Sequence, residues 1–376
     1  MKLKTLKNII FHLSAILIGI VFVYSGFVKA IDPLGTVYKI QDYLEAMHLT
    51  ALNPLATLAT FALFSIEFIA GVMMLLHINL RIGLILTSLM MTAMTPLTLW
   101  IAVANPVSDC GCFGDALVIS NWATFWKNVV ICTLLVLMWL WRKECRYDWL
   151  SKLPSWIVTA TVLIAILWFS ISSLQHLPIK DFRPYRIGTD ILTAMQLPEG
   201  AKKDIYETKF VYSRGGIEQT FTLEEAPYND STWTFVAQNT RLIQKGDEPP
   251  IHDFSITSPD GDDLTYDVLE SGGRYYIVAM YDLEKTNIKA LANVEKLYQQ
   301  SLSEGAGFIA LTASASLIDD FKKQHNIAYD FALTDPIQLK TMVRANPGVV
   351  VLDGSVVVDK YNANMHNSEK FVYTDK

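Results

Sequence analysis

The clearest pattern along the chain is a set of long apolar runs confined to its first 175 residues. Five of them are long enough for membrane helices, since a transmembrane helix needs about 20 mostly apolar residues. They cover residues 9–28, 55–76, 82–103, 122–141 and 156–174. The first run follows Lys2, Lys4 and Lys7, but it is too long for the apolar region of a typical signal peptide and lacks a convincing cleavage site. We therefore expect an all-α transmembrane helix bundle.

Basic residues near the ends of these runs predict the orientation of the bundle. Lys2, Lys4 and Lys7 place the N-terminus in the cytoplasm, and the basic cluster at residues 142–152 agrees with them. The loop between the third and fourth runs, and the chain after residue 175, then face the outside. The predicted location is the bacterial inner membrane, in contact with the lipid bilayer, with the C-terminal part in the periplasm.

From residue 176 onward the pattern is that of a soluble protein. Residues 206–212 and 218–223 alternate in polarity around a Gly-Gly pair, which predicts a β-hairpin, and residues 233–236 are a third candidate strand. Further on, strand-like runs alternate with helical stretches, which predicts an α/β layer. The expected parts are a four-helix membrane domain (1–145), a fifth transmembrane helix (146–177), a small β-rich module (178–245) and an α/β domain (246–376).

Candidate chemistry is concentrated in the loop between the third and fourth runs, which reads DCGCFG at residues 109–114. A disulfide across one residue closes a very small ring whose permitted geometry is far from relaxed, and a strained, exposed disulfide is easily reduced. Cys110 and Cys112 are therefore predicted to be a redox pair; the alternative is two free thiols packed at a helix end. All four cysteines lie in residues 1–145, so the soluble half has no thiol of its own.

Two charged residues near this loop are further candidates. Glu67 interrupts the second apolar run, where an ionisable group is expensive; it is either a proton relay or a protonated carboxyl that bonds to a neighbouring helix. Lys127, at the start of the fourth run, either extends to the lipid head groups or stabilises a nearby thiolate. A quinone is a candidate electron acceptor for the thiols, although tryptophans at the helix ends are equally typical of interfacial anchoring.

Metal and nucleic-acid chemistry are less favoured by the sequence. Methionines at residues 73, 74, 90, 91 and 94 could join the thiols in binding Cu(I), but methionine in apolar helices more often fills space, and no metal site is predicted. The net charge is −6, with no basic stripe of the kind that binds nucleic acid.

The segment GIVFVYSGFVKAIDP at residues 19–33, with Lys39 and Tyr43 after it, resembles the first-helix signature of the DoxX/MauE superfamily. The DCGCFG loop and FWKN at residues 125–128 resemble its MauE (methylamine-utilisation) branch, over about residues 8–142. The resemblance implies a four-helix membrane protein that supports disulfide formation in a periplasmic partner, with Cys110 and Cys112 as its redox pair. It does not imply methylamine metabolism itself.

The last part of the chain, about residues 246–367, resembles a thioredoxin-like domain of the TlpA/peroxiredoxin type. The resemblance is carried by PIHDF at 250–254, the Asp-Gly turn at 260–261, NPG at 346–348 and the Asp-Gly turn at 353–354. It implies that Pro347 is a cis-proline. Where such domains carry Cys-x-x-Cys, this chain reads YDLEKT at 281–286, so the domain is expected to bind or position a partner. Tyr281, Asp282 and Pro347 are the candidate contacts, and the alternative for Tyr281 and Asp282 is an ordinary surface position.

Two functions follow from these observations. In the first, the membrane protein supports thiol–disulfide exchange or electron transfer with a periplasmic thiol or disulfide protein through Cys110 and Cys112. In the second, it is a non-enzymatic scaffold or assembly factor whose cysteine-free domain binds a periplasmic partner. The sequence does not decide between thiol–disulfide oxidoreductase activity and a purely structural role.

Overall fold

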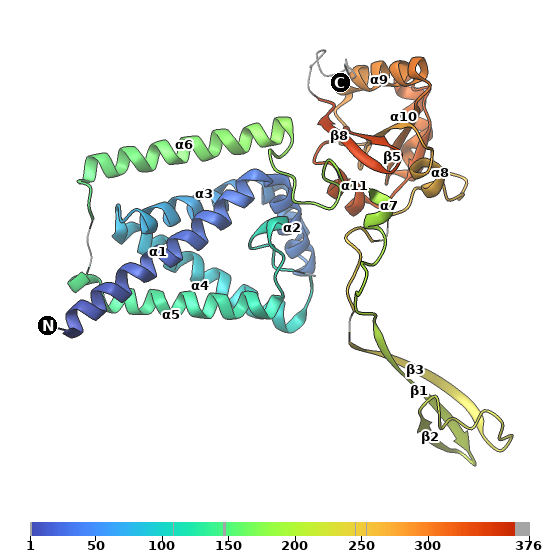
Figure 1. Ribbon diagram of the computed structural model, residues 1–376, viewed down its shortest axis with the longest axis horizontal. Coiled ribbons are helices and arrows are strands. Elements are labelled where there is room, and N and C mark those ends of the chain that lie inside the picture. Colours follow the sequence, from blue (N-terminus) through green and yellow to red (C-terminus); the bar gives the residue numbers. More distant parts are fainter. Residues whose placement is uncertain (1, 108, 146–147, 245, 253, 365–376) are drawn as a thin grey trace.

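The computed structural model describes residues 2–107, 109–145, 148–244, 246–252 and 254–364. It combines a helical N-terminal half, a narrow three-stranded sheet and a C-terminal α/β layer (Figure 1). Arg146 in the predicted basic cluster, Asp253 in the PIHDF segment and the end of the predicted α/β domain after residue 364 lie outside the described residues.

Five helices among the described residues are long and apolar enough to cross a membrane, as the apolar runs predict. They are α1 (Lys2–Ile31), α3 (Ala56–Leu75), α4 (Leu80–Ala104), α5 (Asn121–Cys145) and α6 (Lys152–His176). The amphipathic helix α2 (Pro33–Ala46) and the 3-10 turn η1 (Thr50–Leu55) connect α1 to α3. The Asp32 side chain begins α2 by accepting a hydrogen bond from the Gly35 amide, and Pro33 at the first position suits a helix start.

Glycines allow α1 and α3 to pack with their backbones in close contact. A Cβ atom on Gly26 would lie 2.7 Å from the amide nitrogen of Phe68, and one on Gly71 would lie 2.6 Å from the amide nitrogen of Val23. Small residues are what permits such an approach between membrane helices. The two helices can therefore hold side chains of α1 and α3 in fixed mutual positions.

The two ends of the bundle carry different chemistry. At one end, Lys7 and Glu144 form an ion pair of 3.4 Å near the start of α1 and the end of α5. The other end carries α2, the cysteine loop and the C-terminal α/β layer (Figure 1). The loop and the C-terminal layer thus lie at the same end of the helices.

The predicted β-hairpin is part of an antiparallel sheet with the strand order β2-β1-β3. Its strands are β1 (Ile205–Arg214), β2 (Ile217–Phe221) and β3 (Thr234–Gln244), the third longer than its pattern predicts. The aromatic rings of Tyr212, Phe221 and Phe235 pack edge to face across the three strands. The sheet projects away from the other parts of the molecule (Figure 1).

The C-terminal layer is built on a five-stranded sheet with the order β6-β5-β4-β7-β8, in which β4, β5 and β6 are parallel and β7 and β8 are antiparallel to their neighbours. The strands are β4 (Arg274–Ala279), β5 (Gly307–Thr312), β6 (Phe331–Leu333), β7 (Gly348–Asp353) and β8 (Val356–Asn362). Its helices are α7 (Ile191–Ala194), α8 (Thr265–Leu269), α9 (Leu291–Glu304), α10 (Ile318–His325) and α11 (Pro336–Met342). The sequence pattern predicts the longer elements and misses β6, α7, α8 and α11, which are too short to show a period.

The two faces of this sheet have separate hydrophobic cores. Val294 and Leu297 of α9 and Phe321 of α10 fill one of them. The other core includes Leu339 of α11 and also Tyr185, which belongs to the segment after α6. That segment was expected to open a β-rich module at residue 178, but the separate sheet starts only at Ile205. The sequence pattern does not reveal that Tyr185, directly after Pro184, is a core residue of the C-terminal layer.

The C-terminal layer is fastened to the bundle by a buried arginine. The Arg344 guanidinium is 2.9 Å from the Asp32 carboxylate at the start of α2 and 3.2 Å from the Asp115 carboxylate, just after the cysteine loop. Beside it, the hydroxyls of Tyr38 and Tyr281 are hydrogen-bonded at 3.2 Å. The layer therefore contacts the same loop that holds the thiols.

We expect Gly71→Val to destabilise the bundle, because its side chain would overlap the α1 backbone at Val23. Overpacking of this kind costs about 1–3 kcal/mol or more, so the thermal unfolding temperature in detergent should fall. Leu58→Val, on the exposed face of the same helix, is the matched control. Equal unfolding temperatures for the two variants would contradict the close helix contact.

Candidate functional site

Cys110 and Cys112 lie in the loop between α4 and α5 with their sulfur atoms 2.7 Å apart, both as free thiols. Gly111 between them has a φ of +61°, a conformation that L residues rarely adopt. A Cβ atom there would also lie 2.8 Å from the Lys39 side chain. Glycine at position 111 thus allows the loop both to turn and to lie against α2, and the turn brings the two thiols together.

A buried ion pair between α1 and α3 holds the backbone of this loop. The Lys29 ammonium on α1 is 2.7 Å from the Glu67 carboxylate on α3, and both side chains are almost fully buried. Lys29 also donates hydrogen bonds to the carbonyl oxygen of Cys112 at 2.9 Å and to the Ser25 hydroxyl at 2.6 Å. Ser25 lies within 2.7 Å of the same carbonyl. The ion pair therefore connects two helices to the cysteine loop.

Helix α2 holds the other side of the loop. The Tyr43 hydroxyl donates a hydrogen bond to the Cys110 carbonyl oxygen. The Lys39 ammonium lies 2.5 Å from the Asp109 carboxylate, one residue before Cys110. Together with Lys29 and Ser25, these contacts fix the backbone on both sides of the thiol pair.

The two thiols are electrostatically unequal. A hydrogen bond from Cys110 to the Cys112 sulfur lowers the pKa of Cys112 to about 7, and the charges of Lys127 and Lys29 act in the same direction against burial. The same hydrogen bond, together with burial, raises the pKa of Cys110. Of the two thiols, Cys112 therefore has the lower pKa.

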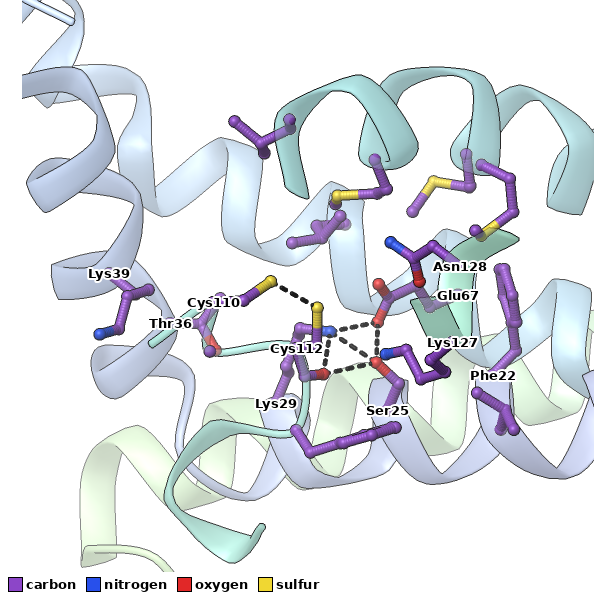
Figure 2. Close-up of a pocket in the computed structure, with 18 of the residues that line it drawn as sticks. Phe22, Ser25, Lys29, Thr36, Lys39, Glu67, Cys110, Cys112, Lys127 and Asn128 are labelled. Carbon is purple, nitrogen blue, oxygen red and sulfur yellow. Dashed lines mark hydrogen bonds and ion pairs between the residues drawn. The ribbon is translucent and has the colours of Figure 1, made fainter. Parts of the chain in front are cut away.

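Both cysteines line a pocket enclosed by α1, α2, α3, α4 and α5, with a volume of about 260 Å³. Figure 2 shows the sulfurs of Cys110 and Cys112 facing each other at this pocket, beside the linked group of Lys29, Ser25 and Glu67. Apolar side chains form much of the rest of the wall: Val21, Phe22, Ala59, Leu63, Leu97 and Ile131. The pocket can hold a small, mostly apolar molecule in contact with the thiols.

The structure brings together four of the residues predicted from the sequence: Cys110, Cys112, Glu67 and Lys127 all line this pocket. Glu67 is paired with Lys29. Lys127 points into the pocket, with its ammonium 4.3 Å from the centre of the Phe113 ring. The proton-relay role of Glu67 and the thiolate-stabilising role of Lys127 stay predictions.

The three residues predicted to bind a partner are not part of the pocket lining. Tyr281 contacts Tyr38 of α2, Asp282 forms an ion pair of 2.7 Å with Lys285, and Pro347 is buried. The peptide bond before Pro347 is cis, as the resemblance implies. Tyr281 thus faces the chain's own membrane bundle, and partner binding by these residues remains a prediction.

Sequence reasoning did not single out Ser25, Lys29, Lys39 or Tyr43 as site residues, although all four are polar residues whose spacing carries a signal. Ser25 and Lys29 are separated by four residues, which places them on one face of α1. Lys39 and Tyr43 have the same spacing on α2. The partner of Lys29 is 38 residues away on another helix, and no local pattern could reveal it.

The methionines considered for copper lie in two places. Met90, Met91 and Met94 line the pocket with the thiols, whereas Met73 and Met74 are buried in the bundle. In the described part of the chain no group of three or more His, Cys, Asp or Glu residues is arranged to hold a metal ion. Cys132 makes a polar contact with Thr95, and Cys145 is buried.

The five apolar helices define a multi-pass membrane protein with a loop-borne thiol pair. Residues 7–142 match the model of the family described as methylamine utilisation protein MauE, so this part of the chain is MauE-like. Residues 206–245, which include most of the separate sheet, match a domain of unknown function (DUF8463). No curated protein and no solved structure matches the chain.

We expect the alkylation rate of Cys112 to rise with pH and to be half-maximal near pH 7, because a lowered pKa keeps the thiolate present above that value. In Cys110→Ala the hydrogen bond is lost, and the midpoint should move to higher pH. Mass spectrometry of the iodoacetamide-labelled peptide gives the rate. A midpoint that stays the same in the variant would contradict the assigned cause.

Lys29→Met should be strongly destabilising, because it leaves the Glu67 carboxylate buried without its partner. Breaking one side of a buried ion pair costs about 3–5 kcal/mol, whereas replacing both sides with apolar groups is often tolerated. We therefore expect Lys29→Met/Glu67→Met to unfold in detergent at a higher temperature than Lys29→Met alone. A double variant that unfolds at the same temperature as Lys29→Met, or at a lower one, would contradict the coupling of Lys29 to Glu67.

Proposed function

We propose that this protein is a membrane thiol–disulfide oxidoreductase in which Cys110 and Cys112 exchange a disulfide with a partner protein. The observation that carries the proposal is the 2.7 Å approach of two free thiols in a loop held by Lys29 and Tyr43. Two further observations agree with it. The pKa of Cys112 is lowered, and both cysteines line a pocket; two thiols with a purely structural role would need neither feature.

The exchange balances without any other reagent. With the pair oxidised, a partner thiolate attacks one of the two sulfurs, breaks the Cys110–Cys112 bond and forms a mixed disulfide. A second partner thiol then displaces the cysteine, so that the partner leaves oxidised and this chain keeps two thiols. The reverse sequence reduces a partner. The lowered pKa makes Cys112 a good leaving group in the first direction.

The distribution of charge supports a proposed orientation in the membrane. Lys7 pairs with Glu144 near the end of α5, and Arg81 and Arg142 line one pocket at the start of α4 and the end of α5. These helix ends are opposite to the ends that the cysteine loop joins, and basic residues favour the cytoplasmic side. The loop and the C-terminal layer would then face the periplasm of a bacterium, with the protein in the inner membrane. An oxidising compartment suits a thiol pair that cycles through a disulfide.

The C-terminal layer is proposed to be a thioredoxin-like domain that has lost its thiols. Its sheet order and its parallel β4 and β5 followed by the antiparallel β7 and β8 support this assignment. Tyr281 and Asp282 follow β4, where the thiols of such a domain would be. This part of the protein would position partners and the cysteine loop without exchanging electrons.

A second candidate is a non-enzymatic scaffold, and one observation favours it. Arg344 of the C-terminal layer contacts both Asp32 and Asp115, so the layer and the loop form one connected surface that could dock a partner without chemistry. In that case the thiols would be dispensable, which makes the two candidates separable by substitution.

We expect Cys110→Ser and Cys112→Ser to differ in cells. A single remaining thiol that reacts with a partner cannot release it, so one variant should accumulate a mixed disulfide that disappears on reduction. Non-reducing gels after acid quenching detect it, and Cys132→Ser is the matched control. Absence of any adduct, together with unchanged behaviour of both variants, would favour the scaffold.

A further inference from the structure

The pocket beside the thiols has the size and wall of a site for a ring-shaped ligand. An apolar cavity of about 150 Å³ is known to bind benzene, and this one holds about 260 Å³. Ala59, Leu63 and Leu97, from helices that are apolar enough to cross a membrane, contribute to its lining. Ala59 is exposed on α3, so the wall reaches the outer surface of the bundle. A ligand could therefore arrive from the lipid phase.

Lys127 gives this pocket a charged group that is available to a ligand. The three protons of the Lys29 ammonium are used by Ser25, Glu67 and the Cys112 carbonyl. Lys127 lies over the Phe113 ring and makes no hydrogen bond or ion pair with the residues that the structure describes. Figure 2 shows its side chain reaching toward the side of the pocket that holds Cys112. A ligand oxygen could accept a hydrogen bond from it.

We propose that this pocket binds the ring of an isoprenoid quinone and that the quinone oxidises the Cys110–Cys112 pair. An apolar ring with oxygen acceptors matches the apolar wall and the available Lys127 ammonium. A quinone is also soluble in the bilayer that would surround these helices. This inference rests on the proposed function, because it supplies the oxidant that a disulfide-forming cycle needs.

The step balances in atoms and electrons. Cys110 and Cys112 each lose a proton, their sulfurs join in one S–S bond, and the pair gives up two electrons. The quinone takes both electrons and two protons and becomes a quinol. Lys127 would hold a quinone oxygen and stabilise the negative charge that develops on it, and Cys112, with the lower pKa, would be the first electron donor.

The test uses the full-length protein in lipid nanodiscs, reduced and kept free of oxygen, with decylubiquinone as the probe. We expect one quinol, measured by absorbance, for each Cys110–Cys112 disulfide, measured by peptide mass. Glutathione disulfide serves as a second oxidant that needs no apolar pocket. Oxidation by glutathione disulfide alone would overturn the quinone site and leave the proposed function intact, whereas oxidation by neither would overturn both.

Two tryptophan substitutions on one helix locate the site. Leu97→Trp fills the pocket, while Leu99→Trp lies on the exposed face of α4. Overfilling should slow the quinone reaction of Leu97→Trp by roughly tenfold or more, with the glutathione disulfide reaction unchanged as evidence that the loop is intact. Leu99→Trp should behave like the wild type. Equal quinone rates in the two variants would overturn the assigned pocket.

The role of Lys127 is tested without thiol chemistry. In the Cys110→Ala/Cys112→Ala background, decylubiquinone binding is measured by equilibrium dialysis with and without Lys127→Met. Loss of one charged hydrogen bond should weaken binding by roughly tenfold. Unchanged affinity would contradict the role of Lys127.

Discussion

The arrangement of the site depends on the buried ion pair between Lys29 and Glu67. A charge in an apolar bundle is costly by itself, and the pair is tolerable because each partner is satisfied by the other and by Ser25. Lys29 donates its remaining proton to the Cys112 carbonyl oxygen. The free-energy cost of burying the two charges therefore depends on the position of the thiol loop. Close packing of α1 and α3 at Gly26 and Gly71 makes this pairing geometrically available.

The second constraint is the contact between the membrane bundle and the C-terminal layer. Arg344 is 8% exposed and contacts Asp32, which begins α2, and Asp115, which follows the thiols. Burial raises the pKa of Asp115 against the opposing charge of Arg344. The loop is thus restrained from inside the bundle by Lys29 and from outside by Arg344. Under the proposed function, a domain without cysteines contributes to thiol chemistry in this way, through position alone.

The sequence predicted the parts of the molecule whose signals are local. The five membrane helices follow from length and apolar composition, and the hairpin follows from alternation around a Gly-Gly turn. Glu67 and the two thiols were identified because a carboxyl at membrane depth and a Cys-Gly-Cys loop are unusual.

Contacts between distant residues could not be predicted. Lys29 and Glu67 are 38 residues apart, and Arg344 and Asp32 are 312 apart. The short elements β6 and α11 also escaped, because neither is long enough to show a period. The site therefore arises from tertiary packing. Packing places polar residues of α1 and α2 around the cysteine loop, which the sequence alone identifies.

The most direct test of the central claim is a redox titration of the purified protein against a glutathione buffer. The mass of the alkylated peptide that contains Cys110 and Cys112 reports the fraction oxidised. We expect one reversible two-electron transition, in which both thiols disappear together into an intramolecular disulfide. Thiols that titrate independently, or that form no disulfide with each other at any buffer ratio, would contradict it.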